Sequence, residues 1–279
     1  AGLYRPVTLV ETAAVAIAEW GMNFTTERLA DGVATVRASV QLRGYEGGDV
    51  QVHFSLSPHP QLSRALGAVM QAESSVDASG RAAVEMKVPQ PMLWAPETPY
   101  LYDLTARVYK RTDKGRYVLL DEVTQATGIR TVDFTAEHGF RLNGQRRKIK
   151  GVCLHHDLGM IGTAVNRAAL KRQLLLLKAM GCDAIRTAHN MPSQWQMQLC
   201  DSLGLMVMAE SFDMWRYPKC RNGYNRFYDD WWQRDLIHLV LSNRLHPSVI
   251  MWSVGNEIPE QGSREGTRML IAMQDLVHL

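Results

Sequence analysis

The sequence predicts a β-sandwich in the first half of the chain and four strand–helix units of an eight-fold (β/α) barrel in the second. Three observations lead to this prediction. Hydrophobic and polar residues alternate up to about residue 135. From Phe140 onward, short apolar runs alternate with segments of helical periodicity. Polar and charged residues follow these apolar runs, at the positions where barrel enzymes carry their chemistry.

The composition is that of a globular protein. The chain has 279 residues, of which 46% are hydrophobic, and a formal net charge of +3. The densest basic group, residues 141–150, alternates with apolar residues, so we expect no nucleic-acid partner. No apolar run approaches the roughly 18 residues of a membrane span, and residues 1–7 lack signal-peptide organisation. We therefore expect a soluble protein, and the compartment is not predicted.

The four cysteines are Cys153, Cys182, Cys200 and Cys220. None forms a C-x-x-C pair, so we interpret them as buried free thiols rather than as a disulfide framework or a zinc site.

In the first half, several segments show the period of two that a half-buried strand requires. They are residues 36–42, 50–56, 84–88 and 102–108. Turn-rich stretches at residues 44–48 and 77–80 separate these segments, as in a small antiparallel sandwich. This half shows no cluster of histidines, cysteines or acids, so we expect it to be structural.

In the second half, a turn at residues 142–145 precedes alternating strands and helices. The predicted strands are 149–154, 184–186, 205–209 and 249–254, and the predicted helices are 166–180, 193–203, 229–245 and 266–279. The first helix places Leu170, Leu174, Leu177 and Met180 on one face. This alternation favours a parallel sheet covered by helices. Half a barrel leaves strand edges unpaired, so we expect a fragment or pairing with another copy.

The residues after each predicted strand are polar, charged or aromatic. They are His155-His156-Asp157, then Arg186 to Asn190, then Glu210 to Trp215, then Asn256-Glu257. Acids, amides and imidazoles can bind hydroxyl groups, and a tryptophan can stack on the apolar face of a ring. The four segments together predict a sugar pocket.

Several of these residues have a structural alternative. Arg186 could simply pair with Glu210 at the barrel mouth, and Asp213 could cap a turn. Because His155 and His156 are adjacent, an extended backbone would point them in opposite directions, so at most one should meet a ligand.

A metal-dependent hydrolase is a separate alternative. Its site would be built from His155, Asp157 and His189, since barrel hydrolases often use such ligands.

Glu257 is the candidate for catalysis. A strand-end glutamate beside Asn256 and below Trp252 is expected to be partly desolvated, which raises the pKa of a carboxyl group toward the range of a general acid. Asn256 could donate to a substrate hydroxyl. A glycosidase of the two-carboxylate type needs a second acid, and this chain shows one.

These segments resemble glycoside hydrolase family 2, the group of β-galactosidases, β-glucuronidases and β-mannosidases. The segments that carry the resemblance are 140–144, 150–157, 181–190, 199–201, 210–215, 246–250 and 252–257. Residues 93–102 and 128–130 resemble the immunoglobulin-like domain of the family, and residues 2–7 resemble the exit from its jelly roll. The resemblance implies the tail end of a jelly-roll sugar-binding domain at 1–8, an immunoglobulin-like sandwich at 9–135, and the first four units of a TIM barrel at 136–279.

The resemblance implies that Glu257 is the general acid/base of a retaining exo-β-glycosidase and that Asn256 contacts the 2-hydroxyl. A loop at residues 212–228 would close over the site. The other residues expected to bind substrate are His155, His156, Asp157, Arg186, His189, Asn190, Glu210, Asp213 and Trp215.

The family's nucleophile is a glutamate on the seventh barrel strand, which no position here matches, so we expect this chain alone to be inactive.

The histidine turn and the loop after the third strand favour a terminal β-galactoside over a β-glucuronide or another β-glycoside. A non-catalytic carbohydrate-binding role is the alternative. No cofactor is expected; Mg²⁺, Na⁺ and a homo-oligomeric parent are implied by resemblance only, without identified ligands.

Overall fold

The computed structural model describes residues 3–60 and 69–278. Within them the chain forms two compact units. We call residues 8–60, 69–148 and 244–247 the sandwich unit, and residues 3–7, 149–243 and 248–278 the barrel unit. Residues 1 and 2 of the predicted jelly-roll tail and residue 279 of the last predicted helix lie outside the described residues.

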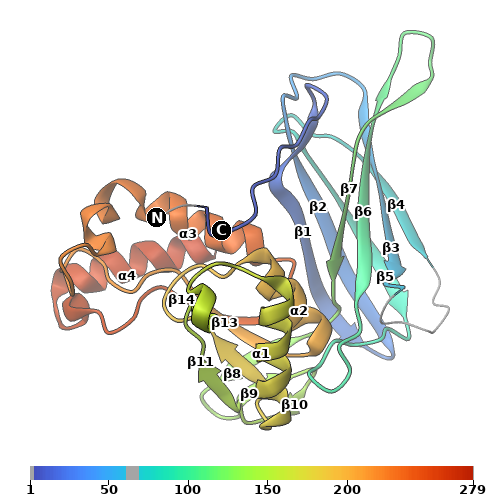
Figure 1. Ribbon diagram of the computed structural model, residues 1–279. Helices are drawn as coiled ribbons and strands as arrows, with labels where there is room; N and C mark the ends of the chain where they lie inside the picture. The colour runs from blue at the N-terminus through green and yellow to red at the C-terminus, as the bar shows by residue number, and fades with distance from the viewer. Residues whose placement is uncertain (1–2, 61–68, 279) are drawn as a thin grey trace. The chain divides into compact units, whose positions relative to one another are not determined.

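The sandwich unit contains two antiparallel sheets, drawn as long strands in Figure 1. One sheet has the order β1 (Ala16–Ala30), β2 (Val33–Arg43), β5 (Arg81–Pro89). The other has the order β4 (Met70–Ser75), β3 (Val50–Pro58), β6 (Tyr102–Arg111), β7 (Tyr117–Thr127). Three plus four strands in two sheets is the immunoglobulin-like arrangement, so the predicted sandwich is confirmed.

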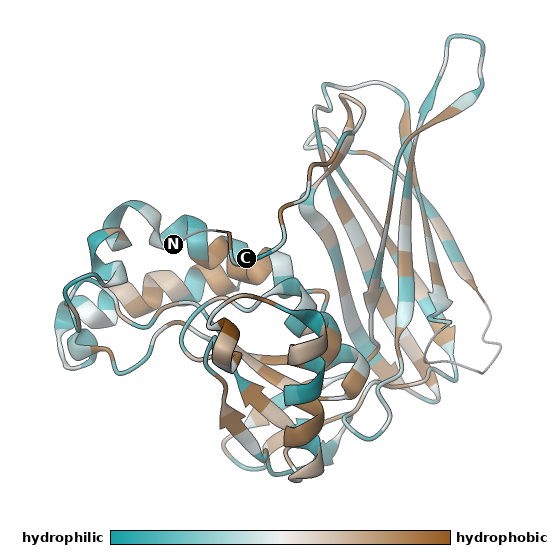
Figure 2. Ribbon diagram, in the orientation of Figure 1, coloured by the Kyte–Doolittle hydropathy of each residue, from teal (hydrophilic) through white to brown (hydrophobic). Residues whose placement is uncertain are grey.

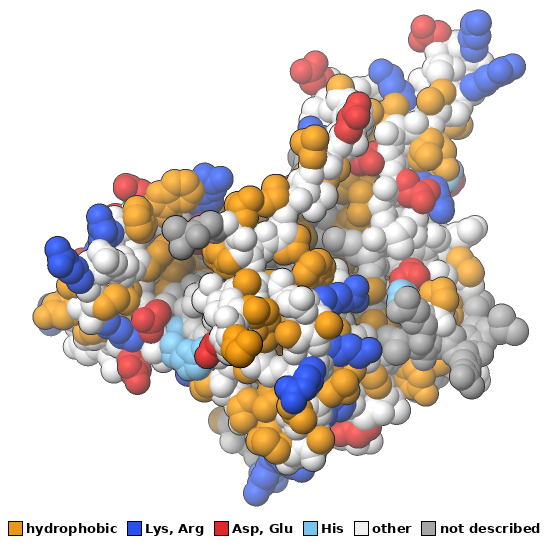
Figure 3. All heavy atoms as spheres, viewed as in Figure 1, with side chains coloured by type: hydrophobic (Ala, Val, Ile, Leu, Met, Phe, Trp, Pro, Cys, Tyr) orange, Lys and Arg blue, Asp and Glu red, His pale blue; other side chains and the backbone are white. Residues whose placement is uncertain are grey.

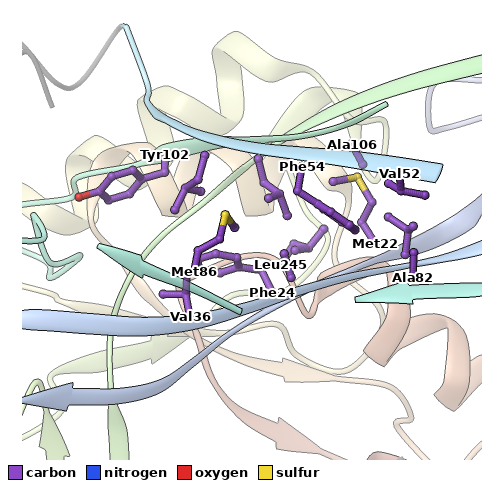
Figure 4. Packing of buried hydrophobic residues seen from close by; sticks show 14 of the residues in the cluster. Met22, Phe24, Val36, Val52, Phe54, Ala82, Met86, Tyr102, Ala106 and Leu245 are labelled. Carbon is purple, nitrogen blue, oxygen red and sulfur yellow. The ribbon is translucent and has the colours of Figure 1, made fainter. Parts of the chain in front are cut away.

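The core of this unit follows from the alternation in its strands, which Figure 2 shows as bands of hydrophobic and hydrophilic residues. Val36, Ala38 and Val40 of β2 are fully or almost fully buried, as are Phe54 and Leu56 of β3. Figure 4 shows side chains of both sheets pointing toward one another in this cluster. Period-two patterning thus buries one face of each sheet and leaves the other polar.

A third, small antiparallel sheet completes the sandwich unit. It contains β8 (Val132–Thr135), β9 (Gly139–Leu142) and β10 (Gln145–Arg146). Asn143 and Gly144, with φ of 53° and 75°, form the two-residue turn between β9 and β10. Asn-Gly suits this turn because both residues tolerate positive φ. The predicted turn at 142–145 is confirmed.

The barrel unit is built on a parallel sheet whose strand order follows the sequence. Its strands are β11 (Gly151–Cys153), β12 (Ala184–Arg186), β13 (Met206–Glu210) and β14 (Val249–Ser253). Its helices are α1 (Arg167–Ala179), α2 (Gln194–Leu203), α3 (Tyr228–Asn243) and α4 (Arg264–Val277). Figure 1 shows α1 and α2 beside the strands. The predicted alternation of strands and helices is confirmed.

Capping residues set the ends of these helices. Asn166, Ser193 and Ser263 each accept a hydrogen bond from the backbone nitrogen three residues later, which satisfies a donor at the start of the helix. Gly204, with φ of 71°, ends α2 in the left-handed conformation that favours glycine. These caps mark where the chain enters α1, α2 and α4 and where it leaves α2.

One predicted helix face was partly wrong. Leu170 and Leu174 are buried against the barrel strands and Leu177 is half-buried, but Met180 is 72% exposed. The reason is that α1 ends at Ala179, so Met180 is its C-cap and leaves the apolar stripe.

Two features concern the expected absence of nucleic-acid and membrane partners: the distribution of basic side chains and the length and apolarity of the helices. On the face shown in Figure 3, lysine and arginine side chains are dispersed among acidic and hydrophobic ones. Within the described part of the chain, no helix has the length and apolarity needed to cross a membrane.

Candidate functional site

The site lies in the barrel unit, at the carboxyl ends of β12, β13 and β14. Its centre is Glu210, the last residue of β13, whose side chain is fully buried. Oε2 of Glu210 accepts hydrogen bonds from Arg186 Nε and Ser253 Oγ, both at 2.6 Å. Oε1 lies 2.6 Å from His189 Nδ1. A buried carboxylate needs such compensation, and here three neighbouring side chains supply it.

Arg186 connects this carboxylate to the strands on either side. Its Nη2 donates to Asn256 Oδ1 at 3.0 Å, and its Nη1 lies 3.9 Å from Cys153 Sγ. Burial alone would lower the pKa of Arg186, but the hydrogen bond and charge of Glu210 raise it. The predicted alternative, an Arg186–Glu210 ion pair, is confirmed. The guanidinium also reaches the residues after β14, so the pair is part of a larger network.

Asn256 is buried and held from two sides. Its Oδ1 accepts from Arg186, and its Nδ2 donates to Asp213 Oδ1 at 3.0 Å. Lys219 Nζ also donates to Asp213 Oδ1, at 3.2 Å. Burial would raise the pKa of Asp213, but the hydrogen bonds from Asn256 and Lys219 and the charge of Lys219 hold it below its ordinary value. These contacts, rather than a turn cap, engage the Asp213 side chain.

Glu257 follows Asn256 and differs from the prediction. Its side chain is 83% exposed, and Oε2 lies 3.8 Å from Lys219 Nζ. The expected desolvation beneath Trp252 was therefore wrong. The residue lies beyond the end of β14 at Ser253 and has a φ of 45°, a backbone conformation that is uncommon for a side chain other than glycine. Glu257 is consequently a carboxylate at the surface of the site, next to a rigid amide.

The two adjacent histidines have different surroundings. His155 is exposed, and its ring meets that of His189 edge-on, with centroids 5.0 Å apart. His156 is half-buried, and its Nε2 is a buried atom with no hydrogen-bond partner among the described residues. Burial, and then the charges of Arg5 and His155, lower the pKa of His156 to about 4. His155 thus lies beside His189 at the site, whereas no contact of the described residues places His156 there.

The N-terminal segment that contains Arg5 is hydrogen-bonded to two loops of the barrel unit. Arg5 Nη2 donates to the carbonyl of Met191 at 2.5 Å, and the carbonyl of Tyr4 accepts from the backbone nitrogen of Val165 at 2.8 Å. The segment at residues 3–7 is therefore bonded to the loops that follow both β11 and β12.

Three predicted residues have other surroundings than expected. Trp215 is 3% exposed and belongs to the hydrophobic core, with Nε1 donating to the carbonyl of Val254 at 2.7 Å. It offers no face for stacking, so that prediction was wrong. Asp157 is exposed and accepts from the backbone nitrogen of Gly159 at 2.8 Å, which closes a turn. Asn190 is exposed, and its backbone nitrogen donates to the carbonyl of Thr187 at 3.2 Å.

The structure adds residues that the sequence analysis missed. Lys219 reaches the site from the long segment between β13 and α3, Ser253 ends β14, and Thr187 accepts from the backbone nitrogen of Glu210 at 3.0 Å. Thr187 and Ser253 could have been found, because Thr187 immediately follows the predicted strand 184–186 and Ser253 is the next-to-last residue of the predicted strand 249–254. Nothing in the local sequence of Lys219 points to the site, because its position depends on how the long segment folds.

A metal site is not supported by the arrangement. In the parts of the chain that the structure describes, no group of three or more histidines, cysteines, aspartates or glutamates is placed to hold a metal ion. His155 packs against His189 edge-on instead of converging with it on a point, and Asp157 is engaged in its own turn.

The cysteine prediction was correct in part. All four thiols are free, but only Cys200 is buried; Cys182 is half-buried, and Cys153 and Cys220 are exposed. Burial, and then the charge of Asp201, raise the pKa of the Cys200 thiol.

Comparison with known proteins connects this geometry to a family. The family model described as "Glycosyl hydrolases family 2, TIM barrel domain" matches residues 132–277, and the model described as "Glycosyl hydrolases family 2" matches residues 16–130. Beta-galactosidase BoGH2A of Bacteroides ovatus is 40% identical over 266 residues, covering 94% of this chain and 30% of its own length. A putative beta-glucuronidase of Formosa agariphila is 34% identical over 256 residues, covering 92% and 24%.

The fold is shared with a solved structure. The crystal structure of a glycosyl hydrolase family 2 member from Bacteroides cellulosilyticus has a TM-score of 0.86 and 34% identity, covering 96% of this chain and 34% of that one. The chain thus spans about a third or less of the length of the relatives it matches.

Proposed function

Because this chain belongs to glycosyl hydrolase family 2, we propose that it forms part of a β-glycosidase in which Glu257 is the general acid/base. The relatives named beta-galactosidase and beta-glucuronidase support this class of reaction. The observation that carries the proposal is the exposed Glu257 carboxylate beside Asn256, whose amide is fixed between Arg186 and Asp213. The activity is proposed for the full-length protein, since the chain spans only part of its relatives.

In this mechanism Glu257 first protonates the glycosidic oxygen and then, as a carboxylate, removes a proton from water. An exposed carboxylate can reach a substrate that docks from solvent. Because the site holds the acid next to the bound substrate, the proton transfer needs no separate collision between the two groups. This lowers the free-energy barrier of the reaction.

The neighbouring groups are arranged to bind hydroxyls. Asn256 uses Oδ1 for Arg186 and one hydrogen of Nδ2 for Asp213, so the second Nδ2 hydrogen can donate to a sugar hydroxyl. His189 faces a carboxylate through Nδ1; since a carboxylate accepts, Nδ1 carries the proton and Nε2 is left for a hydroxyl. Asn256 is held by Arg186 and Asp213. His189 is held by Glu210 and by the ring of His155. Each side chain therefore has one favoured orientation.

Glu210 is not suited to be the nucleophile. Its two oxygens already accept from Arg186, His189 and Ser253, and the side chain is fully buried. A retaining glycosidase needs a second carboxylate roughly 5 Å from the first. The family resemblance assigns it to a seventh barrel strand, outside residues 1–279. We therefore propose that these 279 residues alone are inactive.

The proposed substrate is a terminal β-galactoside, supported by the relative named beta-galactosidase at 40% identity. The relative named putative beta-glucuronidase, at 34% identity, makes a β-glucuronide the second candidate.

The experiment is an assay of the full-length protein with p-nitrophenyl β-galactoside, β-glucuronide, β-glucoside and β-mannoside. We expect the galactoside to be cleaved fastest and proton NMR to show the β-anomer of the free sugar first, since two displacements retain configuration. Faster cleavage of the glucuronide would reverse the choice of substrate. Release of the α-anomer first would contradict the two-step mechanism, and binding of galactose without any hydrolysis would favour a non-catalytic role. The 279-residue chain, assayed in parallel, should release no nitrophenol.

A further inference from the structure

We infer that Lys219 is a positioning residue for the general acid: its ammonium joins the segment at residues 211–227 to Asn256 and Glu257 and holds the Glu257 carboxylate beside the amide of Asn256. This inference rests on the proposed function, because it concerns how Glu257 is presented to a glycosidic oxygen.

The geometry places one ammonium among three oxygens. Lys219 Nζ donates to the carbonyl of Asn256 at 2.6 Å and to Asp213 Oδ1 at 3.2 Å, and it lies 3.8 Å from Glu257 Oε2. An ammonium has three donors and no acceptor, so it matches three oxygens of this kind. The contacts come from residues that follow two different strands, β13 and β14.

The burial of the two partners differs. The side chain of Lys219 is 21% exposed, whereas that of Glu257 is 83% exposed. An exposed glutamate samples several rotamers, and fixing one costs conformational entropy. Lys219 is already fixed by two hydrogen bonds, so Glu257 meets a charge that is held in place before substrate binds. Among the described residues, Lys219 is the cation within 4.0 Å of this carboxylate.

The backbone that carries Lys219 is also fastened to residues beyond β14. Before it in the chain, Trp215 Nε1 donates to the carbonyl of Val254 at 2.7 Å. The backbone nitrogen of Tyr217 donates to Glu260 Oε1, also at 2.7 Å. The backbone before Lys219 is therefore hydrogen-bonded to the chain after β14. These two hydrogen bonds place the Lys219 side chain near Glu257 and do not involve its charge.

This arrangement predicts where the effect of Lys219 appears. Removing an ion pair at such an exposed carboxylate changes the free energy of unfolding little. The step that depends on Glu257 is protonation of a leaving group that departs poorly as an anion. A leaving group such as 2,4-dinitrophenolate departs without that proton. Loss of the Lys219 charge should therefore slow the cleavage of substrates with a poor leaving group much more than the cleavage of a 2,4-dinitrophenyl glycoside.

The test compares Lys219→Met, which keeps the length of the side chain and removes its charge, with wild type in the full-length protein. We expect kcat/KM for an alkyl β-galactoside to fall about 10–100-fold, part of the 10²–10⁴-fold that general acid–base catalysis typically contributes. The 2,4-dinitrophenyl β-galactoside should be nearly unaffected. Lys219→Arg keeps the charge and should recover a substantial part of the loss. Lys171→Met, at an exposed position on α1, is the matched control and should behave as wild type.

Two kinetic results would overturn the inference: no loss with either substrate, or an equal loss with both, which is what a merely structural role produces. A wild-type protein that cleaves no β-glycoside would instead defeat the proposed function. In that case hydrogen exchange of the full-length protein decides. Lys219→Met should speed exchange of the amides at 213–219 and 256–257 relative to those of α1, and unchanged exchange there would contradict the inference.

Discussion

Arg186 donates its Nε–H to Glu210 Oε2 at 2.6 Å, and the carboxylate that accepts it is fully buried. This ion pair joins the ends of β12 and β13, and through Nη2 of Arg186 it extends to Asn256 after β14. The pair therefore sets the spacing of strand ends that carry the proposed sugar-binding groups.

Replacement of Glu210 by glutamine should destabilise the chain. Removing one partner of a buried ion pair leaves the other uncompensated, at a typical cost of about 3–5 kcal/mol, and we expect the lower end because Arg186 is 28% exposed. Chemical denaturation measures the free energy of unfolding. Glu265→Gln is the control, since its pair with Arg216 is exposed and should change that free energy by less than about 1 kcal/mol. Equal effects of the two substitutions would contradict the proposed role of the pair.

Asn256→Ala should reduce kcat/KM of the full-length protein by about 10²-fold, because it removes a positioned donor to the transition state. The sharper test uses a substrate that lacks the 2-hydroxyl. If Asn256 donates to that group, the loss caused by Asn256→Ala should shrink markedly with the 2-deoxy substrate. A loss that is the same for both substrates would show that the amide acts elsewhere.

His156 should make the folded chain less stable in mild acid. Burial lowers its pKa to about 4 in the folded state, compared with about 6.5 for an unperturbed histidine. Protons therefore bind more tightly to the unfolded chain, so the contribution of neutral His156 is complete above pH 6.5 and declines as the pH falls toward 4. Melting temperatures between these values should fall less for His156→Gln than for wild type. His138→Gln, at a half-buried position in the sandwich unit, is the control substitution. Melting temperatures of His156→Gln that fall as steeply as those of wild type would contradict this account.

Thiol labelling should distinguish the four cysteines. Cys153 and Cys220 are exposed and should react quickly with a disulfide reagent in the native chain. Cys200 is buried, and its pKa is raised; since the thiolate is the reactive species, it should react only after unfolding. Mass spectrometry of labelled peptides gives the order. Labelling of Cys200 at the rate of Cys220 would contradict the packing described for α2.

Much of the barrel unit could be predicted from the sequence because local signals agree there. The strand at 184–186 was predicted with its observed bounds, and the helix predicted at 193–203 is α2, with Ser193 as its N-cap. Polar residues after apolar strands correctly indicated that Arg186 and Glu210 lie together.

Parts of the sandwich were missed for physical reasons. In β7 most side chains are exposed or half-buried, so it lacks an apolar face to recognise. β1 changes register twice, between Ile17 and Met22 and between Thr26 and Arg28, which interrupts its alternation. β4 alternates exposed and half-buried residues at the edge of its sheet.

At the site, the burial of Trp215 and the reach of Lys219 depend on the fold of the long segment between β13 and α3, and the exposure of Glu257 depends on the irregular backbone beyond β14. Residue type alone does not determine whether a tryptophan after a strand lies in the core or faces a pocket. Lys219 contacts residues that are 6 and 37 positions away in the chain, and no local period describes such contacts.

The measurement that tests the central claim most directly is the activity of Glu257→Gln in the full-length protein, with Glu265→Gln as the control. If Glu257 is the general acid/base, kcat/KM for an alkyl β-galactoside should fall by about 10²–10⁴-fold, with a much smaller loss for the 2,4-dinitrophenyl substrate. Glu265→Gln should retain wild-type rates with both. Near-native cleavage of the alkyl galactoside by Glu257→Gln would contradict the assignment.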